Sequence, residues 1–190
     1  MNTWDVIVIG AGQAGSAAAW DLAAAGKRVL ILSRAAGAGK PCAGGVTMKA
    51  LKRYRFSIDS VVRETVDTLY VSRHPGHESR LKAPDRFCVM TERSELDQLC
   101  LHEAESRGAS FQLTRGIESV RHSQTTVVVT TREGERYEAD YLIAADGANS
   151  RVRHLLGERA WKGAMAIEGH VDRTEIADYP GMTLDFQAIK

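Results

Sequence analysis

The sequence predicts an α/β protein built on a parallel sheet, and two observations near its N-terminus support this fold class. Residues 6–9 and 29–32 are runs of Val, Ile and Leu, which are typical of strands buried on both faces. Between them, residues 16–25 are rich in alanine, have apolar side chains at helical spacing and are followed by Gly26 as a stop signal. A strand, a helix and a second strand in this order are the first unit of a parallel α/β sheet.

The turn between the first strand and the helix carries a Gly-x-Gly-x-x-Gly motif. Gly10 permits a tight turn, Gly12 lets a diphosphate approach the backbone, and Gly15 lets the helix pack closely on the strand. Gln13 and Ala14 open the helix, where backbone N–H groups and the helix dipole favour an anion. The sequence therefore predicts a Rossmann-like fold that binds an adenine dinucleotide.

Two residues at the end of the second strand bear on which dinucleotide is bound. An acidic residue is usual there, because it accepts hydrogen bonds from the ribose hydroxyl groups, but this sequence has Ser33 followed by Arg34. Ser33 can still hydrogen-bond a hydroxyl group, whereas Arg34 suits a 2′-phosphate. The glycine motif alone thus permits either FAD or NADP.

The middle of the chain predicts an inserted sheet and further Rossmann elements. Alternating apolar and polar residues over 66–89, with a turn at Pro75-Gly76, are typical of a small antiparallel sheet. Ser94 has the position of a helix N-cap, with Asp97 three residues further on. The other expected elements are helices over 47–54 and to about Gly108, strands over 111–113, 117–121, 125–132 and 141–145, a turn at Glu133-Gly134, and a short helix capped by Ser150.

A glycine-rich loop over 37–46 contains the string Lys40-Pro41-Cys42-Ala43-Gly44-Gly45. Together with the opening glycine motif, this string resembles the geranylgeranyl reductase family, whose members use FAD to saturate isoprenoid double bonds. That family belongs to a larger group similar to para-hydroxybenzoate hydroxylase. Residues 93–99 and 139–153 resemble two further signatures of these flavoproteins, so the resemblance covers most of residues 4–153.

The resemblance implies a set of cofactor contacts. Gly44 and Gly45 are expected to place the flavin ring, Arg93 to approach the cofactor, and the backbone near Val120 to border the adenine. Asp146 and Gly147 match the Asp-Gly motif, which favours FAD over NADP because a plain nicotinamide dehydrogenase does not need it. The residues expected to bind FAD are therefore Gly10, Gly12, Gln13, Ala14, Gly15, Ser33, Arg34, Cys42, Ala43, Gly44, Gly45, Arg93, Val120, Asp146 and Gly147.

Cys42 is the candidate catalytic residue. Beside Lys40 and the paired glycines, Cys42 is either a reactive thiol near the flavin or a small packing residue. Cys88 and Cys100 fall on the apolar faces of an expected strand and an expected helix, where burial is the better interpretation. No set of residues has metal-ligand spacing, so we expect no metal site.

The order of the motifs predicts two domains. Residues 1–65 and 92–157 are assigned to a discontinuous FAD-binding domain, and residues 66–91 and 158–190 to part of a substrate domain. Residues 161–172 and 182–186 are expected to begin the next strands of that substrate domain. Related flavoproteins continue with the rest of this domain, so we interpret the sequence as a truncated chain, or a short paralogue, that does not turn over alone.

Composition narrows the classes of function. The chain has 25 Lys and Arg against 24 Asp and Glu, so no overall basic field favours nucleic acid. We identify no signal peptide and no apolar run long enough to cross a membrane. Three cysteines are too few for a disulfide scaffold, so we expect the cytoplasm or its membrane face.

The function expected from these observations is an FAD-dependent oxidoreductase that transfers hydride to an isoprenoid or another apolar small molecule. NADPH or a reduced ferredoxin is the expected electron donor, and peripheral contact with a membrane is expected. A flavin-dependent monooxygenase and a non-catalytic FAD-binding fragment are the alternatives, although the Pro-Cys-Ala-Gly-Gly loop favours the reductase over the monooxygenase. The sequence does not indicate an oligomeric state.

Overall fold

The computed structural model describes residues 3–37, 40–74, 77–159, 167–176 and 181–186. The chain divides into two compact units. The first unit consists of Met1–Lys40 and Ser94–Met165, and the second of Pro41–Arg93 and Ala166–Lys190. The assignment of these segments to a cofactor domain and a substrate domain stays a prediction.

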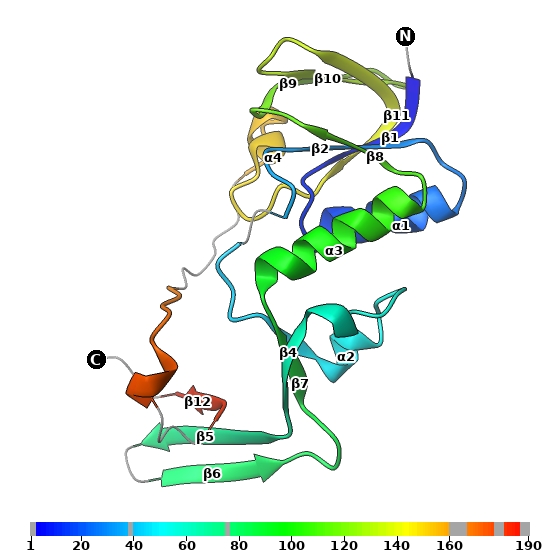
Figure 1. Ribbon diagram of the computed structural model, residues 1–190. Coiled ribbons are helices and arrows are strands. Elements are labelled where there is room, and N and C mark those ends of the chain that lie inside the picture. The colour runs from blue at the N-terminus through cyan, green and yellow to red at the C-terminus, as the bar shows by residue number, and fades with distance from the viewer. Residues whose placement is uncertain (1–2, 38–39, 75–76, 160–166, 177–180, 187–190) are drawn as a thin grey trace. The chain divides into compact units, whose positions relative to one another are not determined.

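The first unit contains a six-stranded sheet with the order β8-β2-β1-β11-β10-β9 (Figure 1). Its strands are β1 (Thr3–Ile9), β2 (Val29–Ser33), β8 (Ser110–Leu113), β9 (Ile117–His122), β10 (Val127–Thr131) and β11 (Arg136–Ala144). β8, β2, β1 and β11 run parallel, whereas β9 and β10 are joined to β11 in antiparallel fashion. The predicted α/β class with a parallel core is therefore confirmed.

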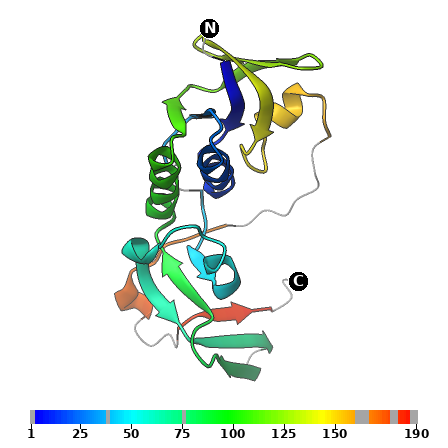
Figure 2. The same cartoon turned by 90° about the vertical axis from the view of Figure 1, so that its right-hand side faces the viewer.

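Alternation of side chains along β1 divides the core of this unit between the two faces of the sheet. Val6 and Val8 face the alanines of α1 (Gln13–Ala24) and the apolar residues of α3 (Arg93–Ser106). Ile7 and Ile9 face the opposite way and pack with residues of β9, β10, β11 and α4 (Arg151–Leu155). Both views show α1 and α3 side by side on one face of the sheet (Figures 1 and 2).

The second unit contains two separate three-stranded sheets. One has the order β3-β7-β4, with β3 at Gly45–Thr47, β7 at Cys88–Thr91 and β4 at Val62–Val66. The other has the order β12-β5-β6, with β12 at Thr183–Asp185, β5 at Thr68–His74 and β6 at His77–Lys82. Short helices complete the unit: α2 (Met48–Leu51), η1 (Asp59–Val61) and η2 (Arg173–Ile176).

The prediction of a single inserted sheet over 66–89 is thus wrong in one respect, because the strands before and after Asp67 belong to different sheets. Val66 pairs with Cys88 of β7, whereas Thr68 pairs with Lys82 of β6. The alternating pattern continues across this point, so the sequence alone gives no sign of the change. β12 confirms the strand expected over 182–186, and it joins β5 in parallel.

Two other expected elements differ from the structure. The helix expected over 47–54 is limited to α2, because Thr47 belongs to β3 and its hydroxyl group caps the helix by accepting a hydrogen bond from the N–H group of Ala50. Residues 167–172 form no strand, while residues 160–166 and the turn expected at Pro75-Gly76 lie outside the described residues. Within the described part of the chain, no helix has the length and hydropathy needed to cross a membrane.

Burial in the parallel core predicts where the fold is most sensitive to truncation of a side chain. Leu32 of β2 is fully buried, so Leu32→Ala should lower the free energy of unfolding by about 2–5 kcal/mol through lost apolar contact and a residual cavity. Urea denaturation followed by circular dichroism measures this change. Leu113→Ala is the matched control, because Leu113 is 61% exposed and its truncation should change stability by no more than about 0.5 kcal/mol. Equal losses in both variants would contradict the assignment of the core.

Candidate dinucleotide-binding site

The glycine turn and the Asp-Gly turn lie side by side at the carboxyl edge of the parallel sheet. The N–H group of Gly10 donates to the carbonyl oxygen of Leu32 at 2.8 Å, and the N–H group of Ala145 donates to that of Ile9 at 2.8 Å. A Cβ atom added to Gly10 would lie 3.2 Å from the Cα atom of Asp146. The structure therefore brings together two predicted motifs that are far apart in the sequence, at the edge where such sheets bind ligands.

Two of the three motif glycines are required by the fold itself. Gly10 has φ +106°, and a Cβ atom there would lie 2.4 Å from the carbonyl oxygen of Ala145. A Cβ atom on Gly15 would lie 1.9 Å from the carbonyl oxygen of Gly10 and 3.3 Å from the side chain of Val8. Because backbone occupies the space at both positions, α1 can pack against the end of β1 only if these residues lack side chains.

Gly12 is different, because neither its conformation nor its packing requires glycine. It is the N-cap residue of α1 with φ −82° and ψ −175°, a backbone conformation that other residues adopt readily. A Cβ atom there would meet no atom of the described residues within 4 Å. The space lies beside the first turn of α1, where N–H groups have no helical acceptors and no acidic side chain is present. These features fit the diphosphate of a dinucleotide.

The side chain of Gln13 links the first turn of α1 to α3. Its Nε2 atom donates to Oδ1 of Asp97 at 2.7 Å, and the thiol of Cys100 donates to its Oε1 atom at 3.3 Å. Asp97 is only 2% exposed, so this link is shielded from water and orients Gln13. The interpretation of Ser94 and Asp97 as a helix cap was wrong, because α3 already begins at Arg93.

Asp97 is not among the site residues expected from the sequence. A signal was present, since Asp97 shares a helix face with Leu101 and Ala104, which lie four and seven residues further along α3 and are buried. A carboxylate on the buried face of a helix needs a hydrogen-bonding partner. The partner itself, Gln13, is 84 residues away and could not be read from this pattern.

The loop that follows β8 borders the position expected for the adenosine ribose. Ser33 is half-buried at the end of β2, and its carbonyl oxygen accepts a hydrogen bond from the N–H group of Thr114 at 2.9 Å. Arg34 is exposed. The structure thus places Ser33 and Arg34 at the same carboxyl edge as Gly10, as predicted from parallel strands, while their contact with a nucleotide stays a prediction.

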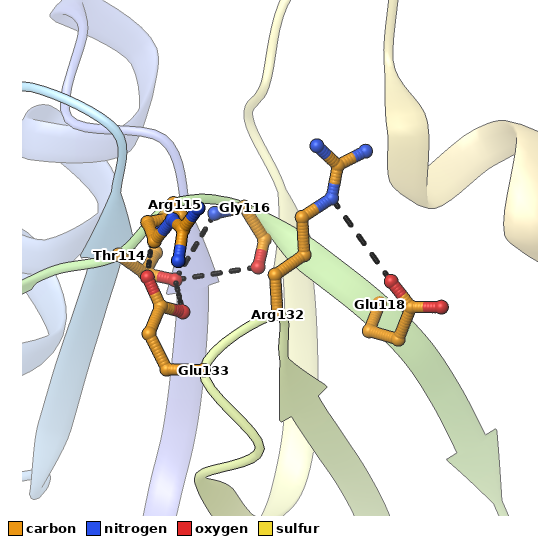
Figure 3. A network of polar contacts seen from close by, with 6 residues as sticks. All are labelled: Thr114, Arg115, Gly116, Glu118, Arg132 and Glu133. Atoms are coloured by element: carbon orange, nitrogen blue, oxygen red, sulfur yellow. Dashed lines mark hydrogen bonds and ion pairs between the residues drawn. The ribbon is translucent and has the colours of Figure 1, made fainter.

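A polar network holds this loop in place (Figure 3). The carboxylate of Glu133 accepts hydrogen bonds from the hydroxyl group of Thr114, at 2.9 Å, and from the N–H group of Arg115. Arg132 forms an ion pair of 4.0 Å with Glu118 on the adjacent strand. The sequence predicted only a turn at Glu133-Gly134, because the loop that Glu133 anchors lies 18 residues earlier.

The same network sets the protonation of Glu133. Desolvation acts to raise the pKa of this carboxyl group, but hydrogen bonds from Arg115 and Thr114 outweigh it and hold the pKa below its ordinary value. A lowered pKa in the folded state means that the carboxylate stabilises the fold at neutral pH, and that this contribution is lost as the pH falls through the carboxyl range. The loop beside Ser33 is therefore anchored most firmly when Glu133 is ionised.

Asp146 organises the turn that follows β11. Its Oδ1 atom accepts from the hydroxyl group of Ser150 at 2.6 Å, and its Oδ2 atom accepts from the N–H groups of Arg151 and Val152 at 2.6 and 3.1 Å. Ser150 in turn accepts from the N–H group of Arg153 at 3.0 Å, which confirms it as the N-cap of α4. The Asp146 carboxylate thus fixes α4 to the carboxyl edge, and its expected contact with the cofactor stays a prediction.

The other predicted site residues of the cysteine loop lie in the second unit. Cys42 and Ala43 are exposed, whereas Gly44 is buried with φ +75°. The carbonyl oxygen of Gly44 accepts hydrogen bonds from the N–H and hydroxyl groups of Thr91 at 3.0 and 2.9 Å, and a Cβ atom on Gly44 would lie 1.8 Å from the Thr91 carbonyl oxygen. Gly44 is therefore required by the packing of the loop on β7.

The remaining predicted contacts lie in β3, α3 and β9. Gly45 is the first residue of β3, and a Cβ atom there would meet only the side chain of Met90 at an ordinary distance of 3.6 Å. Arg93 is the first residue of α3. Val120 lies on β9 opposite Val129 and packs against the core on that face of the sheet. The predicted roles of these residues toward FAD stay predictions.

The two other cysteines are buried, as predicted. Cys88 and Cys100 are each 4% exposed, and desolvation raises the pKa of the Cys88 thiol. The sulfur of Cys88 lies 3.8 Å from that of Met182. Among the described residues, no cluster of three or more His, Cys, Asp or Glu side chains could hold a metal ion.

The fold and the glycine turn together define a dinucleotide-binding α/β protein. Comparison with protein families makes the class more specific, because a family described as an FAD binding domain matches residues 3–181. The match covers nearly the whole chain, and the chain belongs to this family.

Several curated proteins are similar in sequence. The chain is 33% identical over 155 residues to the geranylgeranyl diphosphate reductase of Rhodobacter capsulatus. This match covers 80% of this chain and 39% of the reductase. The chain is also 32% identical over 161 residues to digeranylgeranylglycerophospholipid reductase 1 of Methanopyrus kandleri. That match covers 81% of this chain and 42% of the relative. The chain thus spans less than half the length of these relatives.

Solved structures support the fold. A geranylgeranyl bacteriochlorophyll reductase-like protein of Thermoplasma acidophilum matches with a TM-score of 0.71 and 24% identity, over 83% of this chain and 42% of that one. A p-nitrophenol 4-monooxygenase of Pseudomonas putida also matches with a TM-score of 0.71, at 19% identity over 83% of this chain and 44% of that one. Because reductases and monooxygenases share the fold equally, the fold alone does not choose between them.

The contrast between Gly12 and Gly15 gives a test of the site. Gly12→Ala should leave the free energy of unfolding within about 1 kcal/mol of the original value, because the added methyl group meets open space. The same methyl group would occupy the room for a diphosphate, so FAD affinity should fall at least about tenfold. Fluorescence titration with FAD and urea denaturation measure the two effects.

Gly15→Ala is the matched control for this test. Its added methyl group collides with the carbonyl oxygen of Gly10, so the variant should be strongly destabilised with or without FAD. A Gly12→Ala variant that binds FAD with unchanged affinity would contradict the assignment of the open space to the diphosphate.

The hydrogen bonds around Asp146 give a second prediction. Ser150→Ala removes the cap of α4 and should cost about 1 kcal/mol of unfolding free energy. Asp146→Ala removes three hydrogen bonds to a charged acceptor and should cost more, about 1.5–3 kcal/mol. Thermal or urea denaturation of both variants checks this order, and a larger loss from Ser150→Ala would show that the carboxylate does not organise the turn.

Proposed function

We propose that this chain is the FAD-binding part of an oxidoreductase that reduces carbon–carbon double bonds of isoprenoid substrates. The observation that carries the first half of this proposal is Gly12, where the fold leaves open a space that it does not itself need. That space adjoins the unpaired N–H groups of α1, so its chemistry matches the diphosphate of FAD.

Different residues of this chain would bind different parts of FAD. The glycine turn would hold the diphosphate, Gln13 would be kept in place by Asp97, and Ser33 would meet the adenosine ribose. When bound and reduced, FAD supplies a hydride for addition to one carbon of a double bond, and a proton completes the reduction at the other carbon. The protein's part is to position both partners and to exclude water from between them.

The isoprenoid substrate is proposed from the relatives. Two of them, in Rhodobacter capsulatus and Methanopyrus kandleri, are named as reductases of geranylgeranyl compounds and are 33% and 32% identical to this chain. The Lys40-Pro41-Cys42-Ala43-Gly44-Gly45 loop, which carried the resemblance to this family in the sequence, supports the same substrate class. We propose Cys42, whose side chain is exposed, as a catalytic residue in this loop, and NADPH or a reduced ferredoxin as the electron donor.

Anaerobic spectroscopy tests this function in one preparation. The chain is first titrated with FAD to establish whether one FAD binds per chain. It is then photoreduced with EDTA as the electron donor and mixed with geranylgeranyl diphosphate or a geranylgeranylated phospholipid. The expected result is at most a single round of flavin reoxidation, because the chain is not expected to turn over alone, with saturation of the prenyl chain detected by mass spectrometry. Cys42→Ser should slow this reoxidation while leaving FAD affinity unchanged.

Other outcomes would select the alternative functions. Oxygen-dependent consumption of NADPH that an aromatic compound stimulates, without reoxidation by any prenyl compound, would favour a monooxygenase. Tight FAD binding with no reoxidation by either class of substrate would favour a non-catalytic FAD-binding chain. Failure to take up FAD at all would overturn the proposal as a whole.

A further inference from the structure

Positive charge is unevenly distributed along this chain. Residues 22–58 contain eight Lys and Arg residues and no Asp or Glu, although the whole chain has a formal net charge of only +1. The rest of the chain therefore carries an excess of acidic residues. One of these cations, Arg28, is balanced within the fold by an ion pair of 2.7 Å with Asp5. A local block of one sign favours contact with a surface of the opposite sign where its charges are not balanced in this way.

Half of these cations are gathered on α2 and the segment that follows it, and we call this group the α2 basic surface. It consists of Lys49, Lys52, Arg53 and Arg55, all of which are exposed. Within this short stretch the apolar residues Met48, Leu51, Tyr54 and Phe56 are half-buried. The segment is thus amphipathic, with its cations toward water and its apolar side chains toward the second unit.

The backbone of this segment is ordered by its own hydrogen bonds. Lys52 donates to the carbonyl oxygen of Met48 at 3.2 Å, and Arg53 donates to that of Ala50 at 2.8 Å. Beyond the helix, the rings of Tyr54 and Phe56 meet edge to face with centroids 5.8 Å apart. The cations therefore extend from a fixed scaffold, which reduces the entropy lost when they meet a partner.

The charges of Lys49, Lys52 and Arg53 are not balanced within the second unit as it is described. None of the ion pairs found among the described residues includes Lys49, Lys52 or Arg53. Lys49 lies in α2, Lys52 is the C-cap residue and Arg53 follows it, so three like charges lie within five residues of the chain. Such neighbours repel one another in the free protein, and an anionic partner would relieve this repulsion.

We propose that the α2 basic surface docks on the anionic headgroups of a membrane. A cluster of four Lys and Arg residues on an amphipathic segment is the charge pattern that attracts acidic lipids. An acidic protein partner is less favoured, because Lys is depleted from protein interfaces, which rely on aromatic anchors that are not exposed here. The choice of a lipid surface also rests on the proposed function, because an isoprenoid substrate partitions into the bilayer.

Sedimentation with vesicles tests this docking on the 190-residue chain. Vesicles of equal parts phosphatidylcholine and phosphatidylglycerol should bind the chain, pure phosphatidylcholine vesicles should not, and added salt should weaken the binding. The double variant Lys49→Glu, Lys52→Glu should lower the partition coefficient by more than about tenfold. The milder pair Lys49→Gln, Lys52→Gln should give an intermediate loss, and it replaces the first variant if circular dichroism shows that the glutamates unfold the chain.

A matched control changes the net charge equally at another place. Arg121 and Arg136 are exposed on β9 and β11 of the first unit, so Arg121→Glu with Arg136→Glu should leave vesicle binding within about twofold. Equal binding to neutral and anionic vesicles, or equal loss in the α2 and control variants, would overturn the proposal. Retention on immobilised polyglutamate without vesicle binding would instead assign the surface to an acidic protein.

Failure of the docking proposal can be told apart from failure of the proposed catalytic function. FAD titration of the α2 variants should give the same affinity as the original chain, because these residues are not part of the glycine turn. Loss of vesicle binding with intact FAD binding locates the docking surface. Conversely, absence of reoxidation by prenyl compounds with intact vesicle binding would remove the substrate assignment and leave the docking surface standing.

Discussion

The first unit depends on one close contact between backbones, at the point where α1 leaves the sheet. The space that a Cβ atom of Gly15 would need is taken by the carbonyl oxygen of Gly10, and the space at Gly10 is taken by that of Ala145. This contact sets α1 directly against the end of β1 and brings β11 alongside. As a result, the first turn of the helix and the turn containing Asp146 occupy the same edge of the sheet, where a nucleotide can reach both.

Around that edge, side chains from distant segments hold the turns in place. Gln13 is bound to buried Asp97 of α3, the loop after β8 is bound to Ser33 and anchored by Glu133, and Asp146 is bound to the start of α4. Each tie uses a carboxylate that accepts hydrogen bonds, which are stronger than those between neutral groups. These turns are therefore already fixed before any ligand arrives, which lowers the entropic cost of binding.

In the second unit, the α2 basic surface follows the cysteine loop, which itself requires a glycine at position 44. Gly44 is needed because its carbonyl group packs against Thr91, so the resemblance of the cysteine loop to a flavin-contacting loop has at least one purely structural cause. Shortly after this loop, Lys49 of α2 and the following Lys52 and Arg53 are cations that no ion pair among the described residues balances. A chain with nearly equal numbers of acidic and basic residues thus has a locally basic surface, which total charge conceals.

The sequence by itself determined the parallel core, the glycine turn and the cap at Ser150, because each depends on residues close together in the chain. Buried strands show as runs of β-branched residues, and a turn that needs positive φ shows as glycine. Only the tertiary structure decided that the strands before and after Asp67 join different sheets and that Asp97 binds Gln13. It also decided that Gly12 is the one motif glycine whose packing does not require the absence of a side chain. These features depend on contacts between segments many residues apart, and local periodicity carries no information about which distant residue fills the space beside a given atom.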